Sequence, residues 1–132
     1  MKLHILSPER RLIEGLEVTE ATLPTGEGEI QILPGHAAMI GQIDTGPFSY
    51  KPVGDGETVG VFSSGFFEVR ANTLYVMAET LELKGELDVE RAKKAQKLAE
   101  ETLKAADLDE HKFKKYQLKL QRSLVRQQVA SR

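Results

Sequence analysis

The chain closes with LDVERAKKAQKLAEETLKAADLDEHKFKKYQLKLQRSLVRQQVASR, residues 87–132, and this stretch decides the fold. From Val89 to Ala106 it has no Gly or Pro and consists mostly of Ala, Lys, Glu, Leu and Gln, which favour helices. Asp88 is suited to cap this helix, because a carboxylate accepts hydrogen bonds from the free N–H groups of a first turn. The sequence therefore predicts a helix that starts after Asp88.

Small residues line one face of this first helix. They recur at spacings of three and four residues: Ala92, Ala95, Ala99, Leu103 and Ala106. Alanine removes little apolar area from water, and each Å² is worth only about 25 cal/mol. The stripe therefore predicts that a second helix can approach closely but is held there weakly.

A second helix is predicted after Asp107-Leu108-Asp109, with Asp107 or Asp109 as its cap. Its apolar residues form two strips, the first of Phe113, Tyr116, Leu120 and Leu124 and the second of Leu118, Val125 and Val129. A helix that docks on one partner needs only one such strip. Two strips predict either two docking states or a partner outside this chain.

Basic side chains on the second helix recur with the same spacing. We call them the basic row: Lys112, Lys115, Lys119, Arg122 and Arg126. From residue 111 onward the chain has seven basic residues and no acidic one, whereas the first 110 residues carry eleven basic and twenty acidic residues, a net charge of −9. A basic tail on an acidic body predicts an acidic or phosphorylated target. A solvated helix face that happens to be basic is the alternative, and both interpretations stay open.

The composition is that of one globular domain, or of a small domain with an appendage: 132 residues, 40% hydrophobic and 29% charged. No run approaches the roughly 18 apolar residues of a membrane span, and the polar turn after Leu6 does not fit a signal peptide. The lack of Cys excludes disulfides and fits a reducing compartment. The net charge of −2 argues against a dedicated nucleic-acid-binding protein.

Residues 1 to about 83 predict nine or so short strands, because polar and apolar residues alternate between recurring turn signals. Hairpins are expected at Gly54-Asp55-Gly56 and at Ala71-Asn72-Thr73. Residues 11–14 and 16–24 are expected to be separate strands. Since no helical crossover is visible, the strands are expected to pair antiparallel.

The fold class is therefore α+β, an N-terminal antiparallel β-sandwich followed by a C-terminal two-helix hairpin. The predicted domains are residues 1–84 and 85–132. A linker at about residues 81–86 is expected to join them, with Gly85 as a hinge.

No residue pattern points to catalysis or to a metal. His4, His36 and His111 are far apart in sequence, and none stands at metal-ligand spacing from an acidic residue. The segment Gly26-Glu27-Gly28 lacks the third Gly and the helix of a phosphate-binding loop. No nucleophile elbow, Walker motif or H-E-x-x-H motif occurs. We expect a chain that is not an enzyme, holds no metal and requires no cofactor.

Three stretches, taken in order, resemble the epsilon subunit of F-type ATP synthase: GEIQILPGHA at 28–37, SSGFFEVR at 63–70 with LYVMAE at 74–79, and LDVERA at 87–92. The last is similar to that family's Ile/Leu-Asp-x-x-Arg-Ala nucleotide motif. The resemblance covers nearly the whole chain. The sequence departs from the family at Gln31, where Gly is usual, and at Ser64-Gly65, where a Gly-Gly pair is usual, which leaves the local backbone shape open at both places.

The resemblance implies a non-catalytic rotor subunit of the central stalk, which couples the catalytic head to the membrane ring of c subunits. Its sandwich would lie against the gamma subunit and the c-ring, with Glu29 and His36 on the ring-facing edge. Read without the family, Glu29 is a solvent-facing strand residue and His36 a hydrogen-bond donor in a turn. The resemblance also implies peripheral association with the cytoplasmic face of the bacterial plasma membrane, or with the chloroplast thylakoid membrane.

The family's helices occur folded against the sandwich or extended into the catalytic head of alpha and beta subunits, where they block ATP hydrolysis. The resemblance thus gives the basic row an acidic partner on the head. In some bacterial members the folded form binds ATP as a regulatory ligand. The residues implied here are Glu82, Leu87, Asp88, Arg91, Ala92, Arg122 and Arg126. The plainer interpretation makes Asp88 only a helix cap and Arg91 its partner three residues on.

Two other functions compete with this one. The first is a free-standing ATP-sensing module, and the second is a nucleic-acid adaptor that uses the basic helix. The order of the three motifs favours the rotor subunit and hydrolysis inhibitor.

Overall fold

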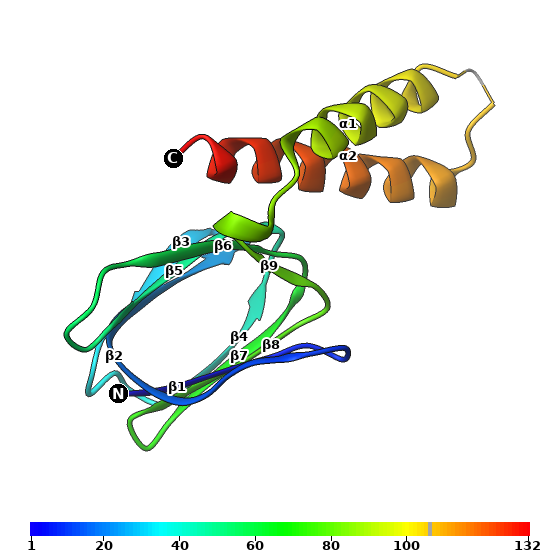
Figure 1. Ribbon diagram of the computed structural model, residues 1–132. Helices are drawn as coiled ribbons and strands as arrows, with labels where there is room; N and C mark the ends of the chain where they lie inside the picture. The colour runs from blue at the N-terminus through cyan, green and yellow to red at the C-terminus, as the bar shows by residue number, and fades with distance from the viewer. Residues whose placement is uncertain (106) are drawn as a thin grey trace. The chain divides into compact units, whose positions relative to one another are not determined.

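The computed structural model describes residues 1–105 and 107–132 (Figure 1). The chain divides into two compact units, residues 1–84 and residues 85–132. Each unit is described by itself.

Unit 1 consists of nine β-strands. Their bounds are β1 Lys2–Leu6, β2 Arg11–Thr25, β3 Gly28–Ile32, β4 Met39–Ile43, β5 Gly46–Pro52, β6 Thr58–Phe62, β7 Gly65–Arg70, β8 Thr73–Ala78 and β9 Leu81–Leu83. The strand order is β4-β7-β8-β1-β2-β5-β6-β9, and β3 also pairs with β2. The long β2 joins the two halves, because its first part pairs with β1 and its second part with β3 and β5. The predicted β-sandwich is confirmed.

The core lies between the two halves of unit 1. Residues of β1 alternate, so that Leu3 and Ile5 are buried while Lys2 is exposed. Phe48 and Phe62 from one half and Phe67 from the other are among the largest fully buried side chains. The period-two pattern that predicted strands is thus the pattern that fills this core.

Both predicted hairpins form. Strands β5 and β6 pair antiparallel around residues 53–57, and β7 pairs antiparallel with β8. In the second turn Ala71 and Asn72 have φ values of +50° and +57°. Two successive residues with positive φ suit a two-residue hairpin turn, because the twist of such a turn matches that of the strands.

The prediction of separate strands at residues 11–14 and 16–24 was wrong, because β2 runs through Gly15 without a break. Gly15 adopts φ +72° where the β1–β2 register shifts. Its N–H donates to Nδ1 of His4 at 3.2 Å. Gly15 therefore lies in a β-bulge, and the pairing of β1 with β2 continues on both sides of it.

The prediction that all strands pair antiparallel was wrong for one pair, because β1 and β8 are parallel. Residues 7–72 connect these strands and contain β2 to β7. Parallel strands need a long connection, which is usually a helix. Here the strands β2 to β7 provide it. Every other pair is antiparallel.

Residues 81–86, predicted as a linker, are structured. Leu81–Leu83 forms β9 and pairs with β6, and Lys84–Glu86 forms one turn of 3-10 helix. Ser63 stabilises the approach to β9, because its hydroxyl accepts from the backbone N–H of Thr80 at 2.8 Å. The chain that leads out of unit 1 is therefore bonded to the sheet up to Leu83.

Tyr50 on β5 gives unit 1 a predicted sensitivity to alkaline pH. Burial raises the pKa of its phenol above 10.0, and the hydrogen bond with Thr58 opposes this rise. A raised pKa in the folded state gives a contribution to stability that is present below about pH 10, the unfolded value, and is lost as the pH rises through the folded value. We expect urea unfolding to show a steeper loss of stability above about pH 10 in the parent than in Tyr50→Phe.

Unit 2 is a helical hairpin of α1, Val89–Leu103, and α2, Glu110–Ala130, in which the chain returns alongside itself (Figure 1). The predicted cap of α1 is confirmed, because Asp88 Oδ1 accepts the Arg91 N–H at 3.1 Å. Asp109 caps α2 by accepting the Lys112 N–H at 2.8 Å. Asp109 is thus the N-cap of α2, and Asp107 is not.

Candidate functional site

The contact between α1 and α2 consists largely of small and polar residues. Ala92 and Ala99 of α1 are buried, as are Ser123 and Val129 of α2. Ala95 and Leu103 are half-buried, and Ala106 lies outside the described residues. We call this contact the hairpin seam. Because a methyl group is small, the seam brings the helices close and buries little apolar area.

The centre of the hairpin seam is polar. The Gln127 side chain donates from Nε2 to Oε1 of Gln96 at 2.7 Å and to the carbonyl oxygen of Ser123 at 3.2 Å. The Ser123 hydroxyl donates to the carbonyl oxygen of Leu120 at 2.7 Å. The sequence analysis missed Ser123 and the two glutamines, since a hydrophobic pattern does not register polar residues. The spacing of Ser123, three residues after Leu120 and seven after Tyr116, could have revealed it.

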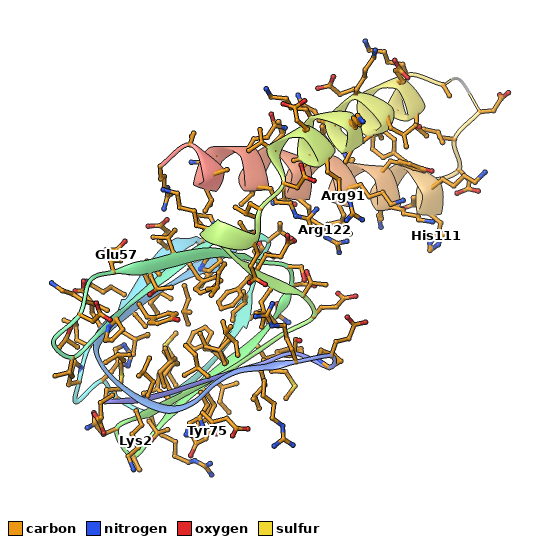
Figure 2. All side chains as sticks on the ribbon, in the orientation of Figure 1. Lys2, Glu57, Tyr75, Arg91, His111 and Arg122 are labelled. Carbon is orange, nitrogen blue, oxygen red and sulfur yellow. The ribbon has the colours of Figure 1, made fainter. Side chains whose placement is uncertain are left out.

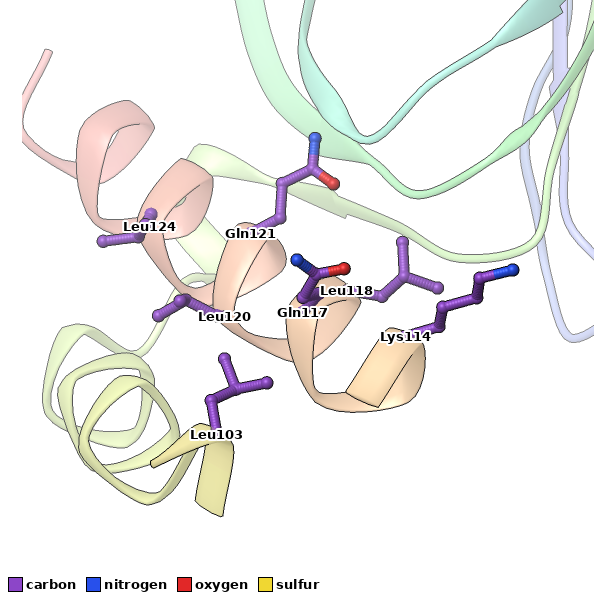
Figure 3. Close-up of a pocket in the computed structure, with 7 residues that line it drawn as sticks. All are labelled: Leu103, Lys114, Gln117, Leu118, Leu120, Gln121 and Leu124. Atoms are coloured by element: carbon purple, nitrogen blue, oxygen red, sulfur yellow. The ribbon is translucent and has the colours of Figure 1, made fainter. Parts of the chain in front are cut away.

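Each apolar strip of α2 is partly exposed. In the first strip Tyr116 and Leu120 are half-buried, whereas Phe113 and Leu124 are 42% and 46% exposed. In the second strip Val129 is buried and Leu118 is 46% exposed. An open groove of about 580 Å³ runs along α2 and is closed at one side by Leu103 of α1 (Figure 3). The hairpin therefore offers apolar surface that its own two helices do not cover.

The basic row is on the same helix, but none of its five residues lines this groove. Lys112, Lys115 and Lys119 are exposed, and Arg122 and Arg126 are half-buried. The Lys119 ammonium stands 4.9 Å from the centre of the Tyr116 ring. Nε of Arg122 is buried and has no hydrogen-bond partner among the residues that the structure describes. A buried guanidinium donor of this kind favours an anionic ligand.

The implied ATP residues lie in both units. Glu82 belongs to β9 of unit 1, and the other six belong to unit 2. Leu87 is half-buried just before the cap of α1, and Arg91 is exposed. Figure 2 labels Arg91 on α1 and Arg122 on α2. Within unit 2 the hairpin therefore provides guanidinium groups from both of its helices.

Two of these residues already have structural roles. The Asp88 carboxylate accepts the backbone N–H of Arg91, so the motif acts as a helix cap without any nucleotide. Ala92 is 3% exposed, so its methyl group is packed in this conformation. These roles agree with the plainer interpretation of Asp88. The bond from Arg91 comes from its backbone and leaves its guanidinium to other contacts.

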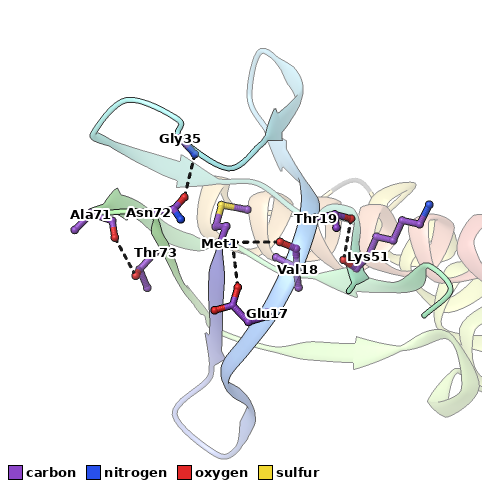
Figure 4. A network of polar contacts seen from close by, with 9 residues as sticks. All are labelled: Met1, Glu17, Val18, Thr19, Gly35, Lys51, Ala71, Asn72 and Thr73. Carbon is purple, nitrogen blue, oxygen red and sulfur yellow. Dashed lines mark hydrogen bonds and ion pairs between the residues drawn. The ribbon is translucent and has the colours of Figure 1, made fainter. Parts of the chain in front are cut away.

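Glu29 and His36, which the resemblance implies at a ring-facing edge, both belong to unit 1. Glu29 is an exposed residue of β3, and His36 follows the Pro34-Gly35 turn. The His36 Nδ1–H donates to the carbonyl oxygen of Ala37 at 2.8 Å. The Gly35 N–H donates to Oδ1 of Asn72 at 3.0 Å, which ties this loop to the β7–β8 turn (Figure 4). His36 thus has the role of a turn donor, and one hydrogen bond holds the loop that carries it to the β7–β8 turn.

Neither a cluster of metal-ligating residues nor a membrane-spanning helix is found in the described residues. No group of three or more His, Asp or Glu in residues 1–105 and 107–132 is arranged to hold a metal ion. Within the same ranges, no helix combines the length and the apolar character needed to cross a membrane.

Comparison with known families matches both units. Residues 1–84 match the family described as ATP synthase, Delta/Epsilon chain, beta-sandwich domain. Residues 86–131 match the family described as ATP synthase, Delta/Epsilon chain, long alpha-helix domain. The chain belongs to the ATP synthase epsilon-chain family. The resemblance seen in the sequence is confirmed, and membership of this family makes the chain a non-catalytic subunit of ATP synthase.

Curated members of the epsilon-chain family are similar over most or all of the chain. The ATP synthase epsilon chain of Trichlorobacter lovleyi is 38% identical over 133 residues, which covers all of this chain and 94% of the relative. That of Brevibacillus brevis is 40% identical over 112 residues, covering 83% of each.

Solved structures show the same fold. A chain of the Euglena gracilis mitochondrial ATP synthase, in a structure of its OSCP, F1 and c-ring, aligns with a TM-score of 0.85 at 22% identity, covering 94% of this chain and 77% of that one. A chain of the Tetrahymena thermophila central stalk and c-ring aligns with a TM-score of 0.69 at 16% identity, covering 98% and 95%.

Proposed function

We propose that the chain is a central-stalk rotor subunit of a proton-translocating F-type ATP synthase and that its hairpin inhibits ATP hydrolysis. The observation that carries this proposal is the combination of a thin, polar hairpin seam with an apolar groove on one side of α2 and a basic row elsewhere on the same helix. A helix so weakly held and so incompletely covered is suited to exchange one partner for another. The fold itself agrees with that of a chain in a structure of a central stalk and c-ring.

The inhibited state follows from the dimensions of the hairpin. The helices of 15 and 21 residues, joined into one helix over 89–130, would reach roughly 63 Å at a rise of 1.5 Å per residue. The basic row would then meet an acidic segment of the alpha and beta subunits. Extension would break the Gln96–Gln127 bond and expose Ala92, Ala99 and Val129, so the fully buried apolar side chains lost are two methyl groups and one valine. The folded and extended states therefore differ by only a few kcal/mol on this proposal.

Deletion of residues 88–132 tests the arm as an inhibitor. Unit 1 keeps its nine strands in this truncation, so we expect it to assemble with the complex and ATP hydrolysis to rise. The measurement is the ATPase activity of the purified complex that contains either the parent or the truncated chain. Staining of the separated subunits checks that both chains are present in the complex in equal amounts. Unchanged hydrolysis at full occupancy would remove the inhibitory role and leave the stalk role.

We propose further that the folded hairpin binds ATP as a regulatory ligand. Support comes from the LDVERA motif at the start of α1 and from the buried Nε of Arg122, which lacks a hydrogen-bond partner within the described residues. Arg91, Arg122 and Arg126 would contact phosphate oxygens, since guanidinium groups bind them in pairs of hydrogen bonds. To move the arm from 1:99 to 99:1 in favour of folding, ATP must prefer the folded state by about 5.5 kcal/mol.

Calorimetric titration of the isolated chain with ATP tests this site. We expect Arg122→Ala to weaken binding roughly 10- to 100-fold, because a hydrogen bond to a charged group is worth about 1.5–3 kcal/mol. Lys114→Ala is the matched control, since Lys114 is an exposed cation of the same helix that pairs with Glu110 at 3.3 Å. Absence of heat with the parent at millimolar ATP would refute the nucleotide site.

The remaining contacts belong to the same proposal. Unit 1 would bind the gamma subunit and the c-ring, with Glu29 and His36 at the ring-facing edge. The hydrogen bond between Gly35 and Asn72 supports such a contact, because a backbone that is already held in place loses less entropy on binding. The chain would then associate peripherally with the membrane through the complex, at the cytoplasmic face of a bacterial plasma membrane.

A further inference from the structure

The alanine face of α1 fixes the lengthwise alignment of α1 and α2 only weakly. Ala92 and Ala99 are buried in the hairpin seam, and Ala95 between them is half-buried. These residues recur at intervals of about one turn, and each presents the same methyl group. If α2 shifted by one turn, about 5.4 Å, one methyl contact would be replaced by another. The alignment of the two helices, which we call the register, therefore needs a further determinant.

A hydrogen bond between two side chains crosses the hairpin seam. Gln127 of α2 donates from Nε2 to Oε1 of Gln96 of α1 at 2.7 Å, and both residues are half-buried. We call Gln96 and Gln127 the glutamine pair. A polar group in a helix contact made largely of small apolar side chains finds its partner in one register and loses it in the others. The glutamine pair therefore distinguishes registers that the methyl groups do not.

Neighbouring residues set the orientation of both amides. Gln96 donates from Nε2 to Oε1 of Glu100 at 2.9 Å, and an ionised carboxylate only accepts hydrogen bonds. The Gln96 oxygen is therefore the atom left for α2. Gln127 donates from the same Nε2 to the carbonyl oxygen of Ser123 at 3.2 Å, one turn back in α2. Because both amides are held in this way, a shift by one turn separates a donor and an acceptor that are already aimed at each other.

We infer that the glutamine pair sets the register of the helical hairpin. The pair acts by excluding shifted registers, and it adds little to the stability of the correct one. A hydrogen bond that replaces two bonds to water contributes little net stability, whereas an unpaired buried amide is costly. This inference about the register does not depend on the proposed function.

The register has a consequence for the proposed nucleotide site, and this consequence does rest on the proposed function. Arg91 belongs to α1, whereas Arg122 and Arg126 belong to α2. A shift by one turn moves the two guanidinium groups of α2 by about 5.4 Å relative to Arg91. Hydrogen bonds from a guanidinium to phosphate are only about 2.7–2.9 Å long, so three groups that meet one triphosphate in one register do not all reach it in another. Gln96 and Gln127 would thus be positioning residues for the nucleotide.

The test of the register is a distance between two spin labels on the full chain. The chain has no Cys, so Lys94→Cys and His111→Cys introduce labels at these two exposed positions alone. Pulsed electron resonance is expected to give one narrow distance in the parent. In Gln96→Leu/Gln127→Leu we expect further maxima displaced by about 5 Å, one turn of helix. Lys97→Leu/Gln128→Leu is the matched control, because it adds two leucines at the next, exposed position of each helix.

Helical circular dichroism separates a register role from a role in stability. Gln127→Leu alone leaves the Gln96 acceptor without its partner, so we expect a lower transition temperature than in the parent. Gln96→Leu/Gln127→Leu removes both partners and replaces them with apolar groups of similar size, so its transition is expected to return to that of the parent or to exceed it. A pair that served only to stabilise the hairpin would leave the double variant at least as unstable as the single one.

Calorimetric titration with ATP tests the consequence for the nucleotide. If three registers are equally occupied, one third of the molecules hold the native one, and the apparent affinity falls about threefold. Unchanged affinity in a double variant that shows several distances would overturn the positioning role. Absence of heat with the parent at millimolar ATP would overturn it too, because the proposed nucleotide site would then fail, but the distances would still decide the register.

The distances decide the inference about the register. Several maxima in Gln96→Leu/Gln127→Leu, with one in the parent and one in Lys97→Leu/Gln128→Leu, support it. A single unchanged distance in the double variant overturns it, as do several maxima in the control. A double variant that loses its helical signal also overturns it, since the pair would then be required for the hairpin to form in any register.

Discussion

Gly65→Ala is expected to destabilise unit 1 by about 3 kcal/mol, the upper end of the cost of overpacking a core. Gly65 opens β7 and pairs with Ala78 of β8. A Cβ at this position would collide with the carbonyl oxygen of Met77 and would stand 2.8 Å from Cα of Ala78. Both obstacles are backbone atoms of a central strand, so no rotamer change can remove them. The two strands must separate locally, and the buried core beside them loosens.

Scanning calorimetry of the isolated chain measures this effect. At about 4–8 °C per kcal/mol for a domain of this size, the transition of unit 1 should fall by roughly 15 °C. Gly56→Ala is the control, because nothing lies within 4 Å of its added Cβ. We expect Gly56→Ala to change stability by about 0.5 kcal/mol or less. If Gly65→Ala has the same transition temperature as the parent, β7 and β8 do not approach each other closely at Gly65.

The two family departures noted in the sequence are each accommodated by a local contact. Gln31 stands where Gly is usual, yet its side chain is exposed and donates to the Glu20 carboxylate at 3.1 Å. Ser64 is exposed, and its hydroxyl donates to Oε2 of Glu79 at 3.3 Å. Neither residue has a positive φ. Within the Ser64-Gly65 pair the close approach is at Gly65, which is where this chain keeps its glycine.

Local features could be predicted from the sequence because their causes lie within a few residues. The caps at Asp88 and Asp109 and the turn at Ala71-Asn72 depend on three or four neighbours each. The parallel pairing of β1 with β8 could not be predicted in this way, since it joins Lys2 to Thr73 across most of unit 1. The bulge at Gly15 was missed for a related reason, because it depends on His4 in another strand.

The candidate site was predictable only in part. The motif at residues 87–92 identifies the start of α1, but its Asp88 is occupied as a cap and its Ala92 is packed. The groove beside Leu118 and Leu124 was foreseen as unpartnered apolar surface on the second helix. The apolar outer surface formed by Leu6, Ile40, Phe66 and Met77 was not foreseen, because these residues come from four strands whose order appears only in the fold. A surface assembled by register has no signature along the chain.

Ala99→Leu is expected to open the hairpin, and it links the seam to the proposed inhibition. Ala99 is 1% exposed on α1, so a leucine there adds three carbon atoms to a contact that has no room for them. Overpacking of this kind costs about 1–3 kcal/mol, and a cost of 2 kcal/mol raises the opening equilibrium about 30-fold. Unit 1 has its own core and should keep its transition. Loss of helical circular dichroism at a lower temperature than in the parent would show the opening.

The effect of Ala99→Leu on ATP hydrolysis is expected to have the opposite sign from the effect of truncation. If the released arm is the inhibitor, a chain that opens more readily must lower ATP hydrolysis by the complex, whereas a chain without residues 88–132 must raise it. Lys94→Leu is the control, because it adds a leucine to an exposed position of α1 and leaves the seam intact. An Ala99→Leu chain that loses its hairpin and yet raises hydrolysis would show that the folded hairpin is the inhibitory form. Opposite signs for the two changes are therefore the result that only a releasable arm explains.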